Sequence, residues 1–261
     1  MIKINASMDV SGFQKSLTEL AGLKKDVPKV VRRVAGNVVK DCVKMTPPFA
    51  GAPSSESFNT QRKAGFRAVS NDLNKLFKDI DELEIMKEAT KKSIGSRLAR
   101  LVKKGDSVGV VRLLNDIKIK AVGFTHTPER DVHLLYRTSY GRTRDLRGSS
   151  FFVSTGLPAF IKSVQKRVGT AKHGWLKAIS ILGIKGIPAW IKNQSGATGS
   201  CTIKGEGTDK IEVTFENNVS FIQRKGRDLK IVKEAFKSTG VRLAKEVQMI
   251  FDARMRKAKR A

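Results

Sequence analysis

Residues 26–48, DVPKVVRRVAGNVVKDCVKMTPP, constrain the fold more than any other stretch, because helix start, period and stop signals agree there. Asp26 is a good helix-capping residue, and Pro28 falls in the first turn, where its missing N–H costs nothing. Pro47 and Pro48 end the pattern, since the residue before a proline is disfavoured in a helix. The stretch predicts one buried helical stripe made of residues three and four apart: Val27, Val31, Val34, Val38 and Cys42.

The composition and length of the chain constrain its fold and its compartment. Valine is a mediocre helix former, so burial against other elements has to hold the helix. At 261 residues the chain is long enough for one large domain or two small ones. Two cysteines, Cys42 and Cys201, are too few and too far apart for a disulfide framework, so we expect buried thiols in a reducing compartment. No secretion signal or membrane-length apolar run is evident, so we expect a cytoplasmic chain with no membrane partner.

The charge balance is strongly basic. The sequence has 51 Lys and Arg against 24 Asp and Glu, a formal net charge of +27. Such an imbalance indicates a polyanionic neighbour or an acidic partner surface. Charge alone does not choose between a ribosomal or DNA-binding protein, a virion component near packaged DNA, and a protein that assembles against acidic subunits.

Apolar periodicity and turn residues predict the remaining elements. They are a strand at 2–4, a helix at 11–23, an extended loop at 49–66, a helix at 67–106, a helix at 107–117 capped by Asp106, a strand at 117–124, a helix at 156–182 stopped by Gly183, an antiparallel hairpin over 200–203 and 210–215, and a closing helix at 229–250. We therefore expect an α+β fold in which long amphipathic helices pack on a small antiparallel sheet.

The segment 126–150 differs from its surroundings because it has turn residues but no apolar period. We expect an exposed loop or hairpin there. Its arginines could bind phosphate in a bidentate manner and its tyrosines could stack on bases. Arginine and tyrosine are also favoured at protein interfaces, so subunit contact and nucleic-acid contact both stay open. The candidate contact residues are Arg130, Arg137, Tyr140, Arg142, Arg144 and Arg147.

Sequence motifs for catalysis are missing. We find no phosphate-binding loop, zinc-protease helix, serine-hydrolase elbow or paired-cysteine zinc pattern. His126 and His133 lack a third metal ligand nearby, and His173, two residues before Trp175, favours packing or a surface role. The acidic cluster at 79–84 is more simply a set of surface ion pairs. We expect no enzymatic activity, no metal and no cofactor.

The order of the patterns carries a resemblance. It consists of a short strand and helix, a Val- and Arg-rich helix ending in Thr46-Pro47-Pro48, the hairpin at 201–215, the turn ENNVSFI at 216–222 and a closing helix. This order resembles the neck and tail-completion proteins of tailed bacteriophages. RVGTAKHGWLKAISILGIKGIPAWI, at 167–191, resembles a helix and Pro-Ala-Trp turn of larger phage members. The resemblance implies a discontinuous α+β core at 1–48 and 185–261, and a mainly helical insertion at 49–184 that contains the Arg-rich loop at 126–150.

The resemblance also implies a function. It implies a structural virion protein that forms a homomeric ring of six or twelve copies at the head–tail junction, as a head–tail connector, neck, tail-completion or tail-terminator protein. Its neighbours would be portal, adaptor or tail-tube proteins, with packaged DNA as a further candidate. Its location would be the neck or tail end of the virion, after assembly in the host cytoplasm. The alternative is a sequence-nonspecific nucleic-acid-binding protein, which salt dependence and oligomeric state would separate from a ring component.

Overall fold

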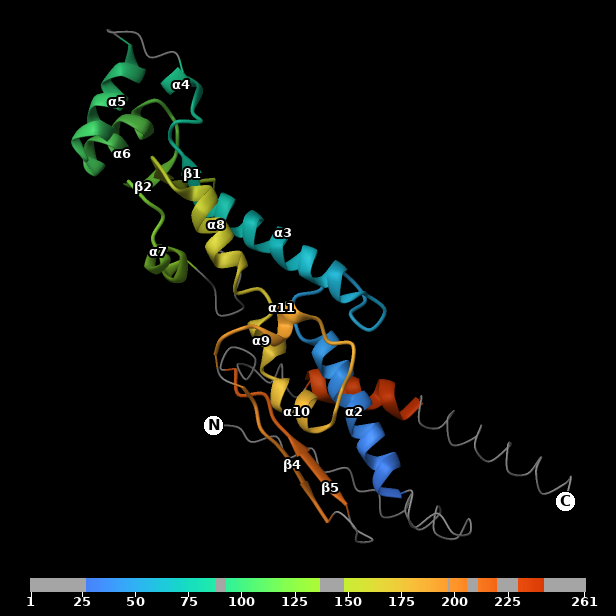
Figure 1. Ribbon diagram of the computed structural model, residues 1–261. Coiled ribbons are helices and arrows are strands. Elements are labelled where there is room, and N and C mark those ends of the chain that lie inside the picture. The colour runs from blue at the N-terminus through green and yellow to red at the C-terminus, as the bar shows by residue number, and fades with distance from the viewer. Residues whose placement is uncertain are drawn as a thin grey trace, which may run out of the picture. The chain divides into compact units, whose positions relative to one another are not determined.

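The chain has an α+β fold made of two units (Figure 1). Unit 1 consists of Met1–Ala64 and Val168–Ala261, and unit 2 is the intervening Gly65–Arg167. The expected strand at 2–4 and helix at 11–23 lie outside the described residues. The computed structural model describes residues 27–87, 93–136, 148–196, 198–205, 211–219 and 230–241.

Helix α2 (Val27–Met45) forms where the sequence predicts it. Its stripe faces the core of unit 1, because Val31, Val34, Val38 and Cys42 are all buried. The side chain of Val27 lies outside the described residues. At the C-terminal end, the amide N and side-chain Oγ1 of Thr46 both donate hydrogen bonds to the main-chain oxygen of Cys42, at 2.9 and 2.7 Å.

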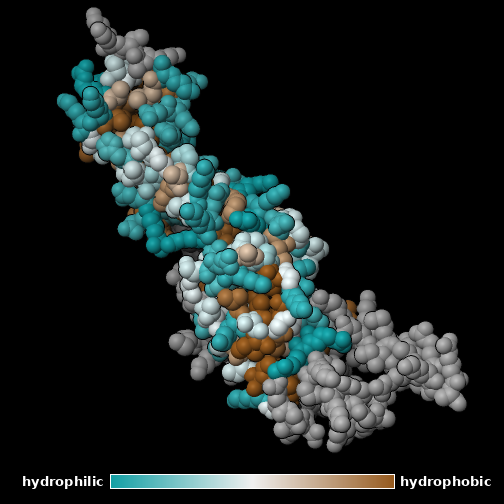
Figure 2. All heavy atoms as spheres, in the orientation of Figure 1, coloured by the Kyte–Doolittle hydropathy of each residue, from teal (hydrophilic) through white to brown (hydrophobic). Residues whose placement is uncertain are grey.

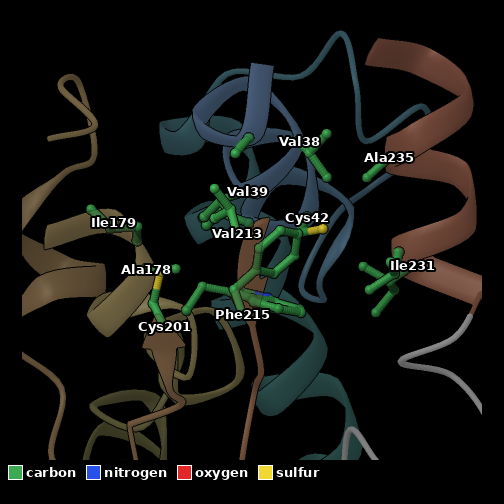
Figure 3. Packing of buried hydrophobic residues seen from close by; sticks show 14 of the residues in the cluster. Val38, Val39, Cys42, Ala178, Ile179, Cys201, Val213, Phe215, Ile231 and Ala235 are labelled. Carbon is green, nitrogen blue, oxygen red and sulfur yellow. The ribbon is translucent and has the colours of Figure 1, made fainter. Parts of the chain in front are cut away.

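The core of unit 1 joins α2 to segments that lie far from it in the sequence. These are α9 (Thr170–His173), α10 (Leu176–Ile181), α11 (Ala189–Lys192), the antiparallel pair β4 (Cys201–Lys204) and β5 (Glu212–Phe215), and the helical residues 230–241. Figure 3 shows side chains of α2, α10, the hairpin and this last helix meeting in one cluster. Cys42 and Cys201 are buried there as free thiols, as expected.

Unit 2 contains a parallel sheet, of which the sequence predicts one strand, at 117–124. Its strands β1 (Phe77–Asp79), β2 (Ala121–Thr125) and β3 (Ser150–Val153) are parallel, in the order β1-β3-β2. Phe77 pairs with Phe151, and Phe124 pairs with Phe152. Successive residues of a strand point to opposite faces, so Phe151 and Phe152 contribute to two different cores.

Helices cover both faces of this sheet. On the face of Phe152, α5 (Ile94–Lys104) and α6 (Ser107–Asp116) bury Leu98 and Leu114, with α4 (Glu84–Lys87) beside them. On the other face, the end of α3 (Phe58–Leu76), α7 (Arg130–Leu135) and α8 (Leu157–Gln165) pack around Phe77 and Val153. Parallel sheets are usually buried on both sides in this manner.

Two predicted elements at 49–106 differ from the structure. The loop expected at 49–66 ends at residue 57, since α3 begins at Phe58 with the hydroxyl of Ser57 accepting a hydrogen bond from the amide of Thr60 (3.1 Å). The helix expected at 67–106 is interrupted after Leu76 by β1, because Phe77 enters the sheet core and the amide of Ile80 bonds to the main-chain oxygen of Val153 (2.8 Å). Helical spacing persists beyond the break because α4 and α5 face the same apolar cluster.

The helix expected at 156–182 is three helices, α8, α9 and α10. Gly169 interrupts it with a backbone φ of +111°, a value that side-chain-bearing residues rarely adopt. Gly183 stops α10 as predicted, with its amide bonded to the main-chain oxygen of Ser180 (3.2 Å). The hairpin is also present, although its turn at 206–210 lies outside the described residues.

The boundaries between the two units lie between residues 64 and 65 and between residues 167 and 168. The resemblance places them between residues 48 and 49 and between residues 184 and 185. Residues 49–64 join unit 1 because the side-chain amide of Gln61 donates to the main-chain oxygens of Lys44 (3.0 Å) and Pro53 (3.1 Å). α9 and α10 join it because Trp175 and Ile179 are buried in the same core as α2.

Candidate interaction surfaces

The Arg-rich segment is only partly described. Arg130 is exposed and is the first residue of α7, so a short helix stands where the sequence analysis expected a loop or hairpin throughout 126–150. That helix forms because Val132 and His133 are drawn into the core of unit 2, where the imidazole meets the ring of Phe160 edge-on. The other five candidates lie outside the described residues: Arg137, Tyr140, Arg142, Arg144 and Arg147.

The opposite side of α7 faces solvent and is unusually apolar for an exposed surface. Leu134 is 49% exposed and Leu135 is 69% exposed. Together with Arg130 they give α7 an outward surface that mixes apolar side chains with a cation. Arginine beside apolar side chains is a composition typical of protein–protein contacts.

A polar cluster lies at the carboxyl ends of β2 and β3 in unit 2, the edge where parallel sheets commonly bind ligands. His126 follows β2, Ser154 follows β3, and the imidazole Nδ1 lies 3.1 Å from the serine Oγ. The amide and hydroxyl of Thr155 both donate to the main-chain oxygen of His126, at 3.0 and 3.1 Å. These bonds tie the two loops together.

The chemistry available to this cluster is limited. A serine nucleophile needs a base that a third polar group orients. Here the second imidazole nitrogen of His126 faces Gly105, and no acidic side chain of the described residues bonds to that ring. Within the described ranges, no group of three His, Cys, Asp or Glu side chains could hold a metal ion. We interpret the cluster as a structural link between two loops.

A second polar cluster closes the C-terminal end of α2 in unit 1, and its centre is a buried lysine. Lys172 of α9 is 0% exposed. Its ammonium donates hydrogen bonds to the main-chain oxygens of Val43 (2.7 Å), Lys44 (3.3 Å) and Thr46. The last carbonyls of a helix have no partner within the helix and carry partial negative charge, so a cation is favoured there.

Residues near Lys172 make further polar contacts at the end of α2. The indole N–H of Trp175 donates to the hydroxyl of Thr46 (2.9 Å). The carboxylate of Glu56 accepts hydrogen bonds from the amides of Ala50 and Gly51, which fixes the loop after α2. Burial lowers the pKa of Lys172 to about 7, and the Glu56 carboxylate opposes part of that shift. The Thr-Pro-Pro end of α2 is therefore attached to α9 and α10 by buried polar contacts.

The turn after β5 is attached to α9. The side-chain amide of Asn217 donates to the main-chain oxygen of Ala171 (2.9 Å), and its oxygen accepts from the amide of Val219 (3.0 Å). The fit is close, because a Cβ at Gly174 would lie 2.0 Å from that side-chain oxygen. Two sequence motifs of unit 1, Thr46-Pro47-Pro48 and the turn at Asn217, thus contact the same segment, residues 171–175.

The strongest concentration of charge among the described elements lies on α5. Its sequence, IGSRLARLVKK, contains four cations and no acidic residue. Arg97, Arg100, Lys103 and Lys104 are all exposed, whereas Leu98 is buried in the core. Figure 2 shows hydrophilic residues around this end of unit 2, with apolar residues between them.

Comparisons with known proteins add no assignment: no family model, no curated protein and no solved structure matches this chain. None of the helices in the described ranges combines the length and apolar character needed to cross a bilayer.

The burial of Lys172 and the row of exposed cations on α5 are not among the features predicted from the sequence. Lys172 lies in the run TAKHGW, and nothing in that run distinguishes a buried lysine from an exposed one. The α5 surface had a readable signal, namely cations at helical spacing with no acidic residue between Ile94 and Lys104.

Proposed function

We propose that this chain is a structural protein of a tailed bacteriophage that forms a homomeric ring at the head–tail junction. One observation carries the proposal: among the segments on which the resemblance rests, those that the structure describes share one core. α2, the β4–β5 hairpin and the helical residues 230–241 come from opposite ends of the sequence and pack together in unit 1. A chance succession of similar patterns would not require them to meet.

The contacts within unit 1 add to this support. Thr46, of the Thr-Pro-Pro motif, bonds to Trp175, and Asn217, of the Asn-rich turn, bonds to Ala171. Trp175 and Ala171 both belong to 167–191, the segment whose sequence resembles larger phage members. The Thr-Pro-Pro motif and the Asn-rich turn therefore each contact the segment at 167–191.

The hairpin offers a means of assembly. β4 and β5 pair with each other and, among the described residues, with no other strand. Within the described part of the chain each strand has one edge that no strand occupies, and joining such an edge is a common mode of association between chains. In the proposed ring the neighbours are further copies of the chain, with portal, adaptor or tail-tube proteins above and below.

The proposal is tested by the mass and shape of the full-length protein. We would measure light scattering after size-exclusion chromatography and take negative-stain images, for the protein alone and after mixing with portal-bearing heads and tail tubes. We expect closed rings with a mass near six or twelve times the 28.8 kDa of one chain, in at least one of the two conditions. A monomer or dimer in both conditions contradicts the proposal.

The second candidate function is sequence-nonspecific nucleic-acid binding, and the exposed cations of α5 favour it. A protein with this function alone should stay monomeric or dimeric and lose affinity for DNA steeply as salt rises. The mass of the same purified sample therefore separates the two candidates.

A further inference from the structure

The four cations of α5 lie on one side of that helix. At 3.6 residues per turn, the side chains of Arg97, Arg100, Lys103 and Lys104 fall within an arc of roughly 120°. The opposite arc holds Leu98, which is buried against the sheet. None of the four cations has a hydrogen bond or ion pair with another described residue. We call these four residues the α5 cation face.

Helix stability does not account for the α5 cation face as a whole. Lys103 and Lys104 lie in the last turn, where a cation is favoured by the helix dipole, but Arg97 and Arg100 gain nothing from it. Like charges three and four residues apart on a helix are destabilising by about 0.2–0.5 kcal/mol per pair. Arg100 has this spacing to Arg97, to Lys103 and to Lys104.

We infer that the α5 cation face binds the phosphate backbone of double-stranded DNA without reading its sequence. Arginine and lysine are the side chains that neutralise phosphates, and such contacts position a protein on DNA independently of base sequence. The choice of duplex DNA rests on the proposed function, because a ring at the head–tail junction surrounds the packaged genome. Binding to a polyanion rests on the α5 cation face itself.

An acidic protein would be a different partner, and the composition of the face disfavours it. Centres of protein interfaces are depleted in charge, especially lysine, and depend on buried aromatic or aliphatic anchors. The arc of the α5 cation face contains no such anchor, since Leu98 points into the core. A row of cations without an apolar centre fits a row of phosphates better.

The test compares two variants of the full-length protein that lose the same charge. The first carries Arg97→Gln, Arg100→Gln, Lys103→Gln and Lys104→Gln. The matched control replaces four exposed lysines of unit 1 that have no described side-chain partner: Lys185→Gln, Lys192→Gln, Lys233→Gln and Lys237→Gln. Fluorescence anisotropy with a short labelled DNA duplex of mixed sequence gives the affinity at several salt concentrations.

We expect the α5 variant to bind the duplex at least about tenfold more weakly than the control variant. The slope of log affinity against log salt concentration should be smaller in magnitude by about 2–3 than the slope of the control variant. The thermal midpoint of the α5 variant should be equal to that of the parent or higher. Equal weakening in both variants overturns the inference, since total charge would then be the cause. Displacement of the duplex by poly-glutamate as effective as by unlabelled DNA also overturns it, in favour of an acidic protein partner.

Oligomeric mass, measured on the same samples, keeps this result separate from the proposed function. If the parent forms no ring but the α5 variant still loses DNA affinity selectively, the ring proposal fails and the DNA contact stands. If rings form and the two variants bind DNA equally, the ring proposal stands and the assignment of α5 fails.

Discussion

Lys172 binds Val43 through a hydrogen bond of 2.7 Å from its ammonium to the main-chain oxygen, across a buried junction between α9 and the end of α2. The same ammonium also donates to the main-chain oxygens of Lys44 and Thr46. An ammonium has three N–H donors, so each can reach a carbonyl that the helix leaves without a partner. One side chain thereby caps the C-terminal end of α2 and attaches this helix to a segment that lies far away in the sequence.

Replacing this lysine should destabilise unit 1. Lys172→Met keeps most of the apolar stem but leaves the main-chain oxygens of Val43 and Thr46 without this donor. We expect a loss of about 1–3 kcal/mol in the free energy of unfolding, the usual cost of an unsatisfied buried polar group. Thermal and urea unfolding measure it, with Lys177→Met on the exposed side of α10 as the control. A stability equal to that of the parent would show that water replaces the ammonium without loss.

The same lysine should make stability depend on pH in the neutral range. Its folded pKa of about 7 lies below its ordinary value of 10.5. Above pH 7 the unfolded chain keeps a proton on Lys172 that the folded chain releases, so the free energy of unfolding should rise with pH. Buried thiols act in the opposite direction at higher pH, since burial raises the pKa of Cys42 and of Cys201 above their ordinary 9.0.

The comparison is therefore made between about pH 7 and 8.5, before unfolded thiols ionise appreciably. Urea unfolding at several pH values should give a rising free energy for the parent and a smaller rise for Lys172→Met. Parallel curves for the two proteins would mean that Lys172 stays charged in the folded state throughout this range.

Two glycines of unit 1 should respond to alanine in opposite ways. Gly174→Ala places a Cβ about 2.0 Å from the side-chain oxygen of Asn217, so the turn has to move and the free energy of unfolding should fall. Gly36→Ala, in the middle of α2, meets its nearest atom in Ile184 at 3.7 Å and should raise stability by about 0.5–1 kcal/mol through helix propensity. Urea unfolding of both variants checks the pair. A loss at both positions would show that neither site tolerates a methyl group.

The parts of the fold that could be read from the sequence are those with local signals. α2 has proline punctuation and a long apolar stripe, and α6 has Asp106, whose carboxylate accepts from the amide of Gly109 (2.8 Å). The hairpin has two short β-rich runs around a turn. In each of these elements the residues that decide the structure lie within a few positions of one another.

The parallel sheet could not be read in this way. β1 is three residues long and directly follows α3, and β3 follows the Arg-rich segment, which has no apolar period. Their pairing partners lie far apart in the chain, so only the folded unit brings Phe77 and Phe151 together. The burial of Lys172 has the same origin, because it depends on where α9 packs and not on the residues beside it.

The Arg-rich segment is predicted to act in assembly and not in folding. Arg137, Arg142, Arg144 and Arg147 fall outside every apolar period of the sequence, and exposed charges contribute little to stability. Replacing all four by alanine should leave the thermal midpoint within a few degrees of the parent. It should weaken ring formation or attachment to a neighbouring ring through lost bidentate contacts, which light scattering and negative-stain imaging of the mixed components would measure.

The α5 variant is the control for this experiment, because it also loses four cations but is expected to affect DNA binding and not assembly. Unfolding of the Arg-to-Ala variant would mean that the four arginines belong to a buried ion-pair network. Assembly and DNA binding equal to those of the parent would mean that they are solvated and have no part in function. A loss of assembly in the Arg-to-Ala variant, with no loss in the α5 variant, would assign subunit contact and DNA contact to two different surfaces of the chain.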